Sequence, residues 1–317
     1  MKKSRKNPCN PCNLWSKIKT IWELIRAEHG LMYGFGVIIG IVIAGGSSYE
    51  PAIFGFLTAL FIQAGTFALN DYCDLESDIA NRRMDRPLVR GEIRKEEALL
   101  IAILATALGI IFAVFLSVIL KNLIFFLLAV TLAALGVLYD IKIKEFFAVS
   151  NFYIAFTMAA PFIFGGLIAE PERIEVVLLI LILSSIAFLA GFGREVMKDM
   201  ADVKGDEIRD VRSIARVYGM EKAKDIAIFS YSLAVILSVV PFFLHNTSYN
   251  FNVAYLLPVM AADALFVHTC FGLKLKPFRK RFDPKTRKVD INYNYMRKET
   301  LIAIVIGLIA FVSGALV

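Results

Sequence analysis

The sequence predicts an all-α integral membrane protein with nine transmembrane helices. The chain has 317 residues, of which 58% are hydrophobic, and its mean hydropathy is +0.65. Soluble globular domains are less apolar than this. Apolar runs recur along almost the whole chain, and many approach the ~20 residues that cross a bilayer as a helix. Because the backbone in hydrocarbon must satisfy its own hydrogen bonds, we expect these runs to be helices.

Nine apolar segments are expected to span the membrane within a single domain covering residues 1–317. They are 31–46, 52–70, 97–119, 123–139, 151–169, 174–193, 226–245, 252–272 and 299–316. The fourth segment is short, and Pro161, Pro241 and Pro258 are expected to kink three others. Residues 1–20 are expected to form a basic cytoplasmic segment before the first helix, and the polar stretch 274–298 to form a loop before the last.

The distribution of basic residues predicts the orientation. If the N-terminus is cytoplasmic, every Lys and Arg except Lys121 and Arg173 falls in a cytoplasmic connection. We therefore expect a multi-pass protein of the cell membrane, with its N-terminus and active site on the cytoplasmic side. The net charge of +7 then reflects topology and attraction to anionic headgroups. The expected partner is the lipid bilayer and not nucleic acid, because no nucleic-acid-binding module is recognisable.

An acidic motif follows the second apolar segment. Asn70, Asp74 and Asp78 are spaced i, i+4, i+8, which places them on one face of a helix leaving the membrane. Asp71 points about 100° away from Asn70 and is a weaker candidate ligand. Carboxylates at a membrane edge are costly to desolvate, so such residues are expected to be functional.

A second acidic motif follows the sixth segment. Asp199, Asp202 and Asp206 are spaced i, i+3, i+7, again on one helical face, and Arg194 and Lys198 place positive charge beside them. Hard divalent cations prefer carboxylate oxygens. Two such motifs on the same side of the membrane therefore predict a site for divalent cations and for the phosphate groups that these cations carry.

Other chemistries are less well supported by the sequence. Cys9 and Cys12 form a CxxC pair, but two further zinc ligands are absent nearby. A CDP-alcohol phosphotransferase would also use intramembrane aspartates, but its characteristic motif does not occur. A cation transporter would place acids in broken helices at the middle of the membrane. Both remain more distant alternatives.

The same residues resemble the signatures of a known family. The Asn70–Asp78 motif, followed by Asn81-Arg-Arg-Met-Asp-Arg-Pro-Leu88, resembles the first signature of the UbiA-type intramembrane prenyltransferases, and Arg194–Asp206 resembles the second. Tyr139-Asp-x-Lys142-x-Lys144 is similar to the family's tyrosine–lysine segment. The resemblance implies nine helices around a central cavity that opens to the cytoplasm.

The resemblance also implies a reaction and its residues. A prenyl group, expected to be geranylgeranyl, would leave its diphosphate as an allylic carbocation and alkylate a hydrophobic acceptor. One Mg²⁺ would be held by Asn70, Asp74 and Asp78, and a second by Asp199, Asp202 and Asp206. The residues expected to be catalytic are Asp74, Asp202, Lys142 and Tyr139. Phosphate contacts are expected from Arg82, Arg86, Lys142, Arg194 and Lys198, and a contact with the acceptor or its phosphate from Arg26.

Two classes of acceptor stay open from the sequence. The residue pattern of the second motif favours geranylgeranylglyceryl phosphate, an intermediate of ether lipid synthesis. The alternative is an aromatic precursor of a quinone. The chain also departs from the family pattern after the second motif, where residues 207–215 replace a common Thr-Leu-Pro run.

Overall fold

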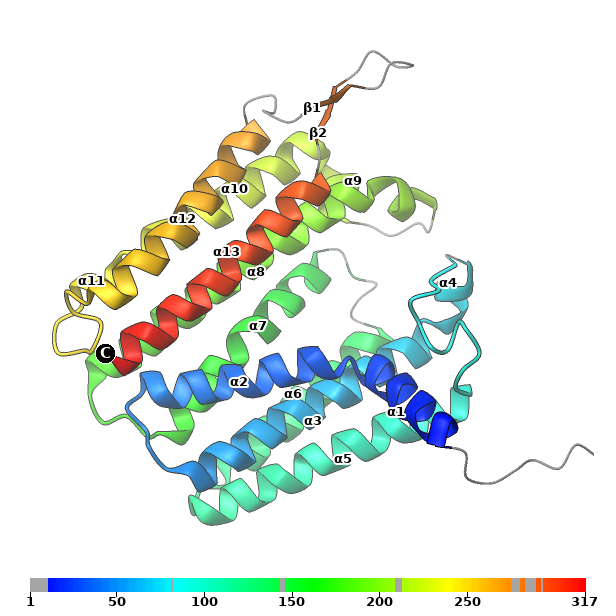
Figure 1. Cartoon of the computed structure of the whole chain (residues 1–317), viewed down its shortest axis with the longest axis horizontal. Helices are drawn as coiled ribbons and strands as arrows, with labels where there is room; N and C mark the ends of the chain where they lie inside the picture. Colours follow the sequence, from blue (N-terminus) through cyan, green and yellow to red (C-terminus); the bar gives the residue numbers. More distant parts are fainter. Residues whose placement is uncertain are drawn as a thin grey trace, which may run out of the picture. The chain divides into compact units, whose positions relative to one another are not determined.

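The computed structural model describes residues 11–80, 82–142, 146, 148–208, 213–274, 280–282, 289–291 and 293–317. Nearly all of these residues are helical (Figure 1), which confirms the predicted all-α class. The exception is a short antiparallel pair, β1 (Lys280–Phe282) and β2 (Val289–Ile291). It lies within the polar stretch that the sequence predicted as a loop before the last helix.

Eight helices in the described part of the chain are long and apolar enough to cross a membrane. A bent pair, α1 (Pro11–Ile25) and α2 (Ala27–Ile43), raises the number to nine if it is one span, so the predicted number of nine is consistent with the structure. The eight are α3 (Tyr49–Cys73), α5 (Lys95–Ile119), α6 (Ile124–Ile141), α7 (Val149–Ile168), α8 (Ile174–Ile208), α10 (Met220–Ser238) with α11 (Val240–Phe243), α12 (Val253–Lys274) and α13 (Tyr293–Leu316). Two helices are short: α4 (Leu75–Ala80) carries the end of the first acidic motif, and α9 (Ile214–Tyr218) follows the second.

The three prolines expected to kink helices behave differently. The helix is interrupted next to Pro241, which lies in the first turn of α11. A proline is well tolerated there because its missing N–H would have no intrahelical partner. In contrast, α7 continues through Pro161 and α12 through Pro258.

The chain divides into two compact units, and each is described by itself. The first unit contains Met1–Phe35 and Ile53–Ile141, and therefore α1, the start of α2, most of α3 and α4 to α6. Leu24, Ala68, Leu88, Ala98 and Ala102 form a buried cluster in it. Small residues let α3 and α5 approach closely, since a Cβ at Gly109 would collide with α3. The first acidic motif thus lies at the end of a closely packed helix pair.

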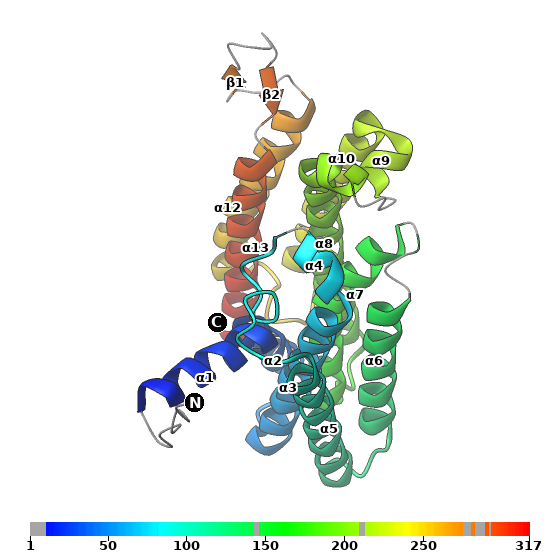
Figure 2. The same ribbon diagram turned by 90° about the vertical axis from the view of Figure 1, so that its right-hand side faces the viewer.

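The second unit contains Gly36–Ala52 and Lys142–Val317. Its long helix α8 contacts α7, α10 and α13, and α12 packs along α13 (Figures 1 and 2). Leu179, Leu183, Tyr249 and Tyr255 are among the residues buried in its core. This packing holds the second acidic motif, which lies on α8. The expectation of a single domain over the whole chain stays a prediction.

Candidate functional site in two acidic motifs

The first acidic motif crosses a break between two helices. α3 ends at Cys73 and α4 begins at Leu75. The backbone hydrogen bonds nevertheless continue at helical spacing, from the Asp74 N–H to the Asn70 carbonyl at 2.9 Å and from the Asp78 N–H to the Asp74 carbonyl at 2.8 Å. The predicted row of Asn70, Asp74 and Asp78 is therefore kept through the break.

Asn70 is held by two carboxylates. Its amide nitrogen donates to Oδ2 of Asp74 at 3.1 Å and to Oδ1 of Asp140 at 3.0 Å. Since an amide NH₂ has two hydrogens, both donors are used and Oδ1 is the atom of Asn70 that can ligate a cation. Asp140 is buried near the end of α6, and sequence analysis did not select it. A carboxylate directly beside Tyr139 at the end of an apolar segment was the signal that could have found it.

Asp71 has a different role from its neighbours in the motif. It is buried and accepts hydrogen bonds at Oδ1 from Arg26 at 2.8 Å and from Arg86 at 2.9 Å. The Arg26 guanidinium also lies 4.5 Å from the centroid of the Phe67 ring. Arg26 and Arg86, two of the arginines that the sequence predicted to bind substrate, thus form ion pairs with Asp71. Their contact with phosphate stays a prediction.

The loop after α4 connects the first motif to α1. Nε of Arg86 lies 3.8 Å from Asp78, and burial raises the pKa of the Asp78 carboxyl above its ordinary value. Arg90 pairs with Glu23 of α1 and, at 2.8 Å, with Glu92. Arg82 is exposed in the same loop. The loop therefore carries arginines that are fixed by acids as well as one that points to solvent.

The second motif lies within an uninterrupted helix. α8 continues to Ile208, which confirms that the motif is helical. Asp199 accepts a hydrogen bond at 2.9 Å from the Asn151 amide of α7. Glu195 is buried, accepts a hydrogen bond from Lys198 at 3.0 Å and lies 3.7 Å from Arg194. The side chains of Asp202 and Asp206 lie outside the described part of the structure.

Tyr139 and Asp140 lie at the end of the first unit, and Lys142 is the first residue of the segment 142–317 that belongs to the second unit. Tyr139 is half-buried and Lys142 is exposed, while Lys144 and Asn81 lie outside the described residues. Among the side chains that are described, no three of His, Cys, Asp or Glu lie close enough together to hold a metal ion. An ion bound there would therefore need amide or substrate oxygens as well, which is the usual arrangement for Mg²⁺.

Comparison with known proteins assigns the family. The family model described as the UbiA prenyltransferase family matches residues 33–276. The chain belongs to the UbiA prenyltransferase family. The predicted enzyme class, a prenyltransferase, and the predicted multi-pass membrane fold are thereby confirmed.

Two relatives match this chain over nearly its full length. It is 44% identical over 300 residues to a digeranylgeranylglyceryl phosphate synthase of Archaeoglobus fulgidus, covering 94% of this chain and 96% of the relative. A protein of the same name from Methanocaldococcus jannaschii is 30% identical and is covered to 97%.

Solved structures agree with the fold. A structure described as a digeranylgeranylglyceryl phosphate synthase in membranes matches with a TM-score of 0.73 at 30% identity, covering 94% of this chain and 98% of that one. A UbiA homolog from Archaeoglobus fulgidus bound to GPP and Mg²⁺ matches with a TM-score of 0.61 at 19% identity, covering 94% of this chain and all of the other.

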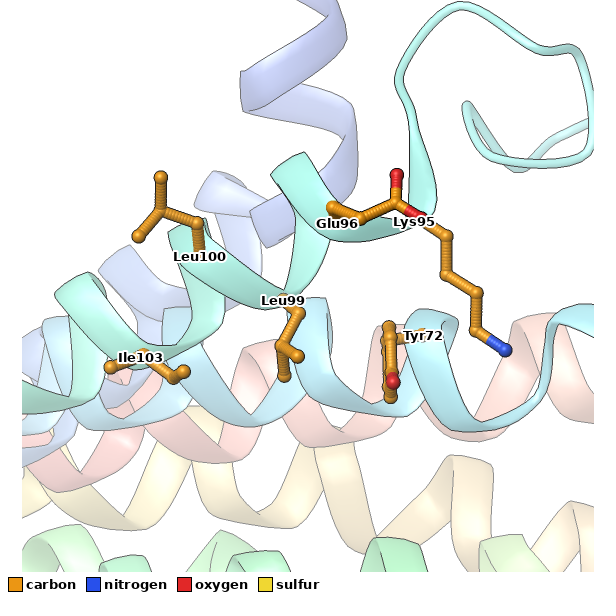
Figure 3. A pocket seen from close by; sticks show the side chains of 6 residues that line it. All are labelled: Tyr72, Lys95, Glu96, Leu99, Leu100 and Ile103. Atoms are coloured by element: carbon orange, nitrogen blue, oxygen red, sulfur yellow. The ribbon is translucent and has the colours of Figure 1, made fainter.

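The chain also has an open pocket whose lining does not include Asn70, Asp74 or Asp78. Its volume is about 380 Å³, and it is lined by Tyr72, Lys95, Glu96, Leu99, Leu100 and Ile103 (Figure 3). The Lys95 ammonium lies 4.9 Å from the centroid of the Tyr72 ring. None of the site residues predicted from the sequence lines this pocket.

Proposed function

We propose that this prenyltransferase transfers the geranylgeranyl group of geranylgeranyl diphosphate to geranylgeranylglyceryl phosphate. The observation that carries the choice of acceptor is the 44% identity, over nearly the full length of both chains, to a digeranylgeranylglyceryl phosphate synthase. Relatives with the same name recur at about 30% identity in several archaea. The second motif favours the same acceptor, because residues 198–206 follow the pattern Lys-Asp-x-x-Asp-Val-x-Gly-Asp.

The metal partner in this proposal is Mg²⁺, and the side chains present fit it. Asn70, Asp74 and Asp78 offer hard oxygen ligands in one row, and two carboxylates orient the Asn70 amide. Two solved structures of a UbiA homolog from Archaeoglobus fulgidus, at 19% identity, are described as bound to Mg²⁺ with GPP or DMAPP. We assign one ion to this row and a second ion to Asp199, Asp202 and Asp206. Bound Mg²⁺ would neutralise the diphosphate as it leaves.

The chain's own side chains would bind and orient the two substrates. The C1–O bond of the donor breaks and the diphosphate keeps the electron pair, so groups that stabilise its developing charge accelerate the reaction. Arginine suits this task because its planar guanidinium matches phosphate oxygens. The proposed phosphate contacts are Arg82, Arg86, Lys142, Arg194 and Lys198. A glycerol hydroxyl oxygen then bonds to C1 and loses its proton, so an ether and diphosphate are the products.

Two further residues, Tyr139 and Arg26, complete the proposed site together with Lys142. Tyr139 and Lys142 lie close to Asp140 in the sequence, and the hydrogen bond from Asn70 to Asp140 supports the proposal that they act beside the first ion. Arg26 would contact the acceptor phosphate, if substrate competes with Asp71 for its guanidinium. We place the site on the cytoplasmic side, because the basic residues of the chain gather in the connections on that side.

The test is turnover of the purified full-length protein in lipid with labelled geranylgeranyl diphosphate. Geranylgeranylglyceryl phosphate should be alkylated, and 4-hydroxybenzoate and dihydroxynaphthoate should not. Alkylation of an aromatic acceptor without alkylation of the phosphoglycerol would overturn the acceptor but not the enzyme class. Removal of divalent cations with EDTA should stop diphosphate release, and added Mg²⁺ should restore it. Turnover that continues in EDTA would contradict the metal assignment.

A further inference from the structure

Helix α1 carries an exposed apolar stripe. The exposed fractions of Trp15, Ile18 and Trp22 are 73%, 46% and 43%. These residues are three and four positions apart, so they lie along one face of the helix, and Ile21 widens it. Single exposed apolar residues are ordinary, but a continuous stripe with two tryptophans marks a surface that contacts something apolar.

The opposite side of α1 is docked onto its own unit, which fixes the direction of the stripe. Leu24 is fully buried in the cluster that contains Leu88 and Ala98. The Thr20 hydroxyl donates to Glu92 at 3.3 Å, and Glu23 pairs with Arg90. Since these contacts hold the helix in one rotation about its axis, the stripe faces away from the first unit.

The angle between α1 and α2 separates α1 from the membrane span. The two helices are bent by 56° at Arg26, whose φ is +45°, and Figures 1 and 2 show α1 leaving the line of α2. α2 has 17 residues and is itself about 25 Å long, close to the length needed to span the hydrocarbon. α1 carries Lys17, Lys19 and Glu23, whose burial in hydrocarbon would be costly.

We propose that α1 lies in the plane of the membrane interface, against an anionic lipid surface on the side of the first acidic motif. Tryptophan is enriched at the boundary between headgroups and acyl chains, and a helix with one apolar and one charged face binds there. Charge complementarity selects anionic lipid, because Lys17 and Lys19 lie on α1 and four further basic residues lie within positions 2–6 of the sequence. This binding site for lipid does not depend on which acceptor the enzyme uses.

The proposed contact has a consequence for the site. The same helix that would rest on lipid holds Arg90 and Glu92 through its other face. Those two residues belong to the loop that follows the first motif and contains Arg86. The lipid surface would therefore support the position of this loop from outside the active site.

The chain supplies its own probe for the test. Its two tryptophans, Trp15 and Trp22, both lie in α1, so all tryptophan fluorescence reports on this helix. The Trp22→Phe variant of the full-length protein isolates Trp15. In vesicles containing anionic phospholipid, lipids brominated near the headgroup should quench Trp15 more than lipids brominated near the chain ends. Acrylamide should quench it less than it quenches the protein unfolded in denaturant.

The matched variant Trp15→Phe isolates Trp22, which lies on the same stripe and whose indole donates to Glu28 at 2.6 Å. Lipids brominated near the headgroup should quench Trp22 as well, but less than Trp15, because Trp22 is less exposed. Replacing the anionic lipid by neutral lipid, or making Lys17→Gln with Lys19→Gln, should increase quenching of Trp15 by acrylamide. Quenching by acrylamide without quenching by lipid would overturn the proposal, because α1 would then face water. Strongest quenching by the deepest bromines would also overturn it, because α1 would be part of a broken span. These readouts do not use turnover, so they are independent of the proposed acceptor.

Discussion

The two acidic motifs of this enzyme are built in different ways. The first crosses a break between α3 and α4, and its Asp71 is bound by arginines 45 and 15 residues away in the sequence. The second runs through the continuous helix α8, and its Glu195 is paired with the neighbouring Arg194 and with Lys198 one turn away. The first motif therefore organises segments that are distant in the sequence, whereas the ion pairs that the structure describes for Glu195 of the second join residues of the same helix.

The two motifs nevertheless share one device. In each, an asparagine amide joins a motif residue to a neighbouring helix: Asn70 to Asp140 of α6 in the first, and Asn151 of α7 to Asp199 in the second. In each, one buried acid, Asp71 or Glu195, pairs with two basic side chains and is not among the acids assigned to metal. The motif residues therefore have three proposed roles: some bind metal, some hold basic side chains in ion pairs, and some accept or donate a hydrogen bond that orients a metal ligand. Loss of each role should affect a different property, namely turnover, stability or metal affinity.

The largest expected effect is loss of a proposed metal ligand. Asp74→Ala and Asp202→Ala should each lower kcat by about 100-fold or more, because the charge of the leaving diphosphate would be less well neutralised. The two variants should be equally inactive if each motif holds one ion. Asp85→Ala, which removes an exposed acid close to the first motif, is the matched control and should stay active. Near-normal turnover in either ligand variant would refute the assignment of that motif to metal.

The next effect is on stability and should differ between the motifs. Asp71→Asn leaves two arginines without their carboxylate, and we expect the free energy of unfolding to fall by about 3 kcal/mol. Glu195→Gln loses pairs in which Lys198 is partly exposed, and we expect a loss of about 1 kcal/mol. Unfolding in detergent, followed by circular dichroism, compares the two. Equal losses would contradict the distinction between a long-range anchor and a local one.

The amide contacts should affect metal affinity more than stability. Asp140→Ala and Asn151→Ala each remove a partner that orients a proposed ligand, and such changes typically weaken metal binding by about tenfold or more. The Mg²⁺ concentration for half-maximal activity should rise accordingly, with kcat largely restored at saturating Mg²⁺. A fall in kcat that no concentration of Mg²⁺ restores would assign these residues a direct catalytic role instead.

Much of this fold was predictable because membrane helices obey local rules. Length and hydropathy identified the spans from α3 to α13 closely, since a helix in hydrocarbon satisfies its hydrogen bonds within itself. The bend at Arg26 was not predictable from hydropathy, because α1 is amphipathic and its docking depends on distant residues such as Leu88 and Arg90. The short β1–β2 pair was missed for a similar reason, as its pairing joins strands of three residues each.

For the candidate site too, local geometry was predictable from the sequence and contacts between distant segments were not. Helical spacing correctly placed Asn70, Asp74 and Asp78 on one row, and gave Asp71 a separate direction. It could not show that Asp71 is neutralised by Arg26 and Arg86, because those contacts join separate segments of the chain. Asp140 was missed because a lone aspartate has no periodic partner in its own segment, and its hydrogen bond to Asn70 joins residues 70 positions apart in the sequence.

The smallest effect on stability is expected for the solvent-exposed pair of Arg83 and Asp85, which lies in the loop after the first motif. Arg83 donates to Asp85 at 2.9 and 3.0 Å, and this hydrogen bond lowers the pKa of the Asp85 carboxyl below its ordinary value. A carboxyl with a lowered pKa in the folded state contributes stability above its unfolded pKa, and this stability is lost as the pH falls through the folded pKa. Because the Asp85 side chain is 58% exposed, Arg83→Ala should cost about 0.5 kcal/mol or less at pH 7. The difference from wild type, measured by unfolding from pH 7 to pH 3, should vanish at the acidic end. A loss as large as that of Asp71→Asn would show that solvent-exposed pairs in this loop anchor the motif as strongly as its buried one.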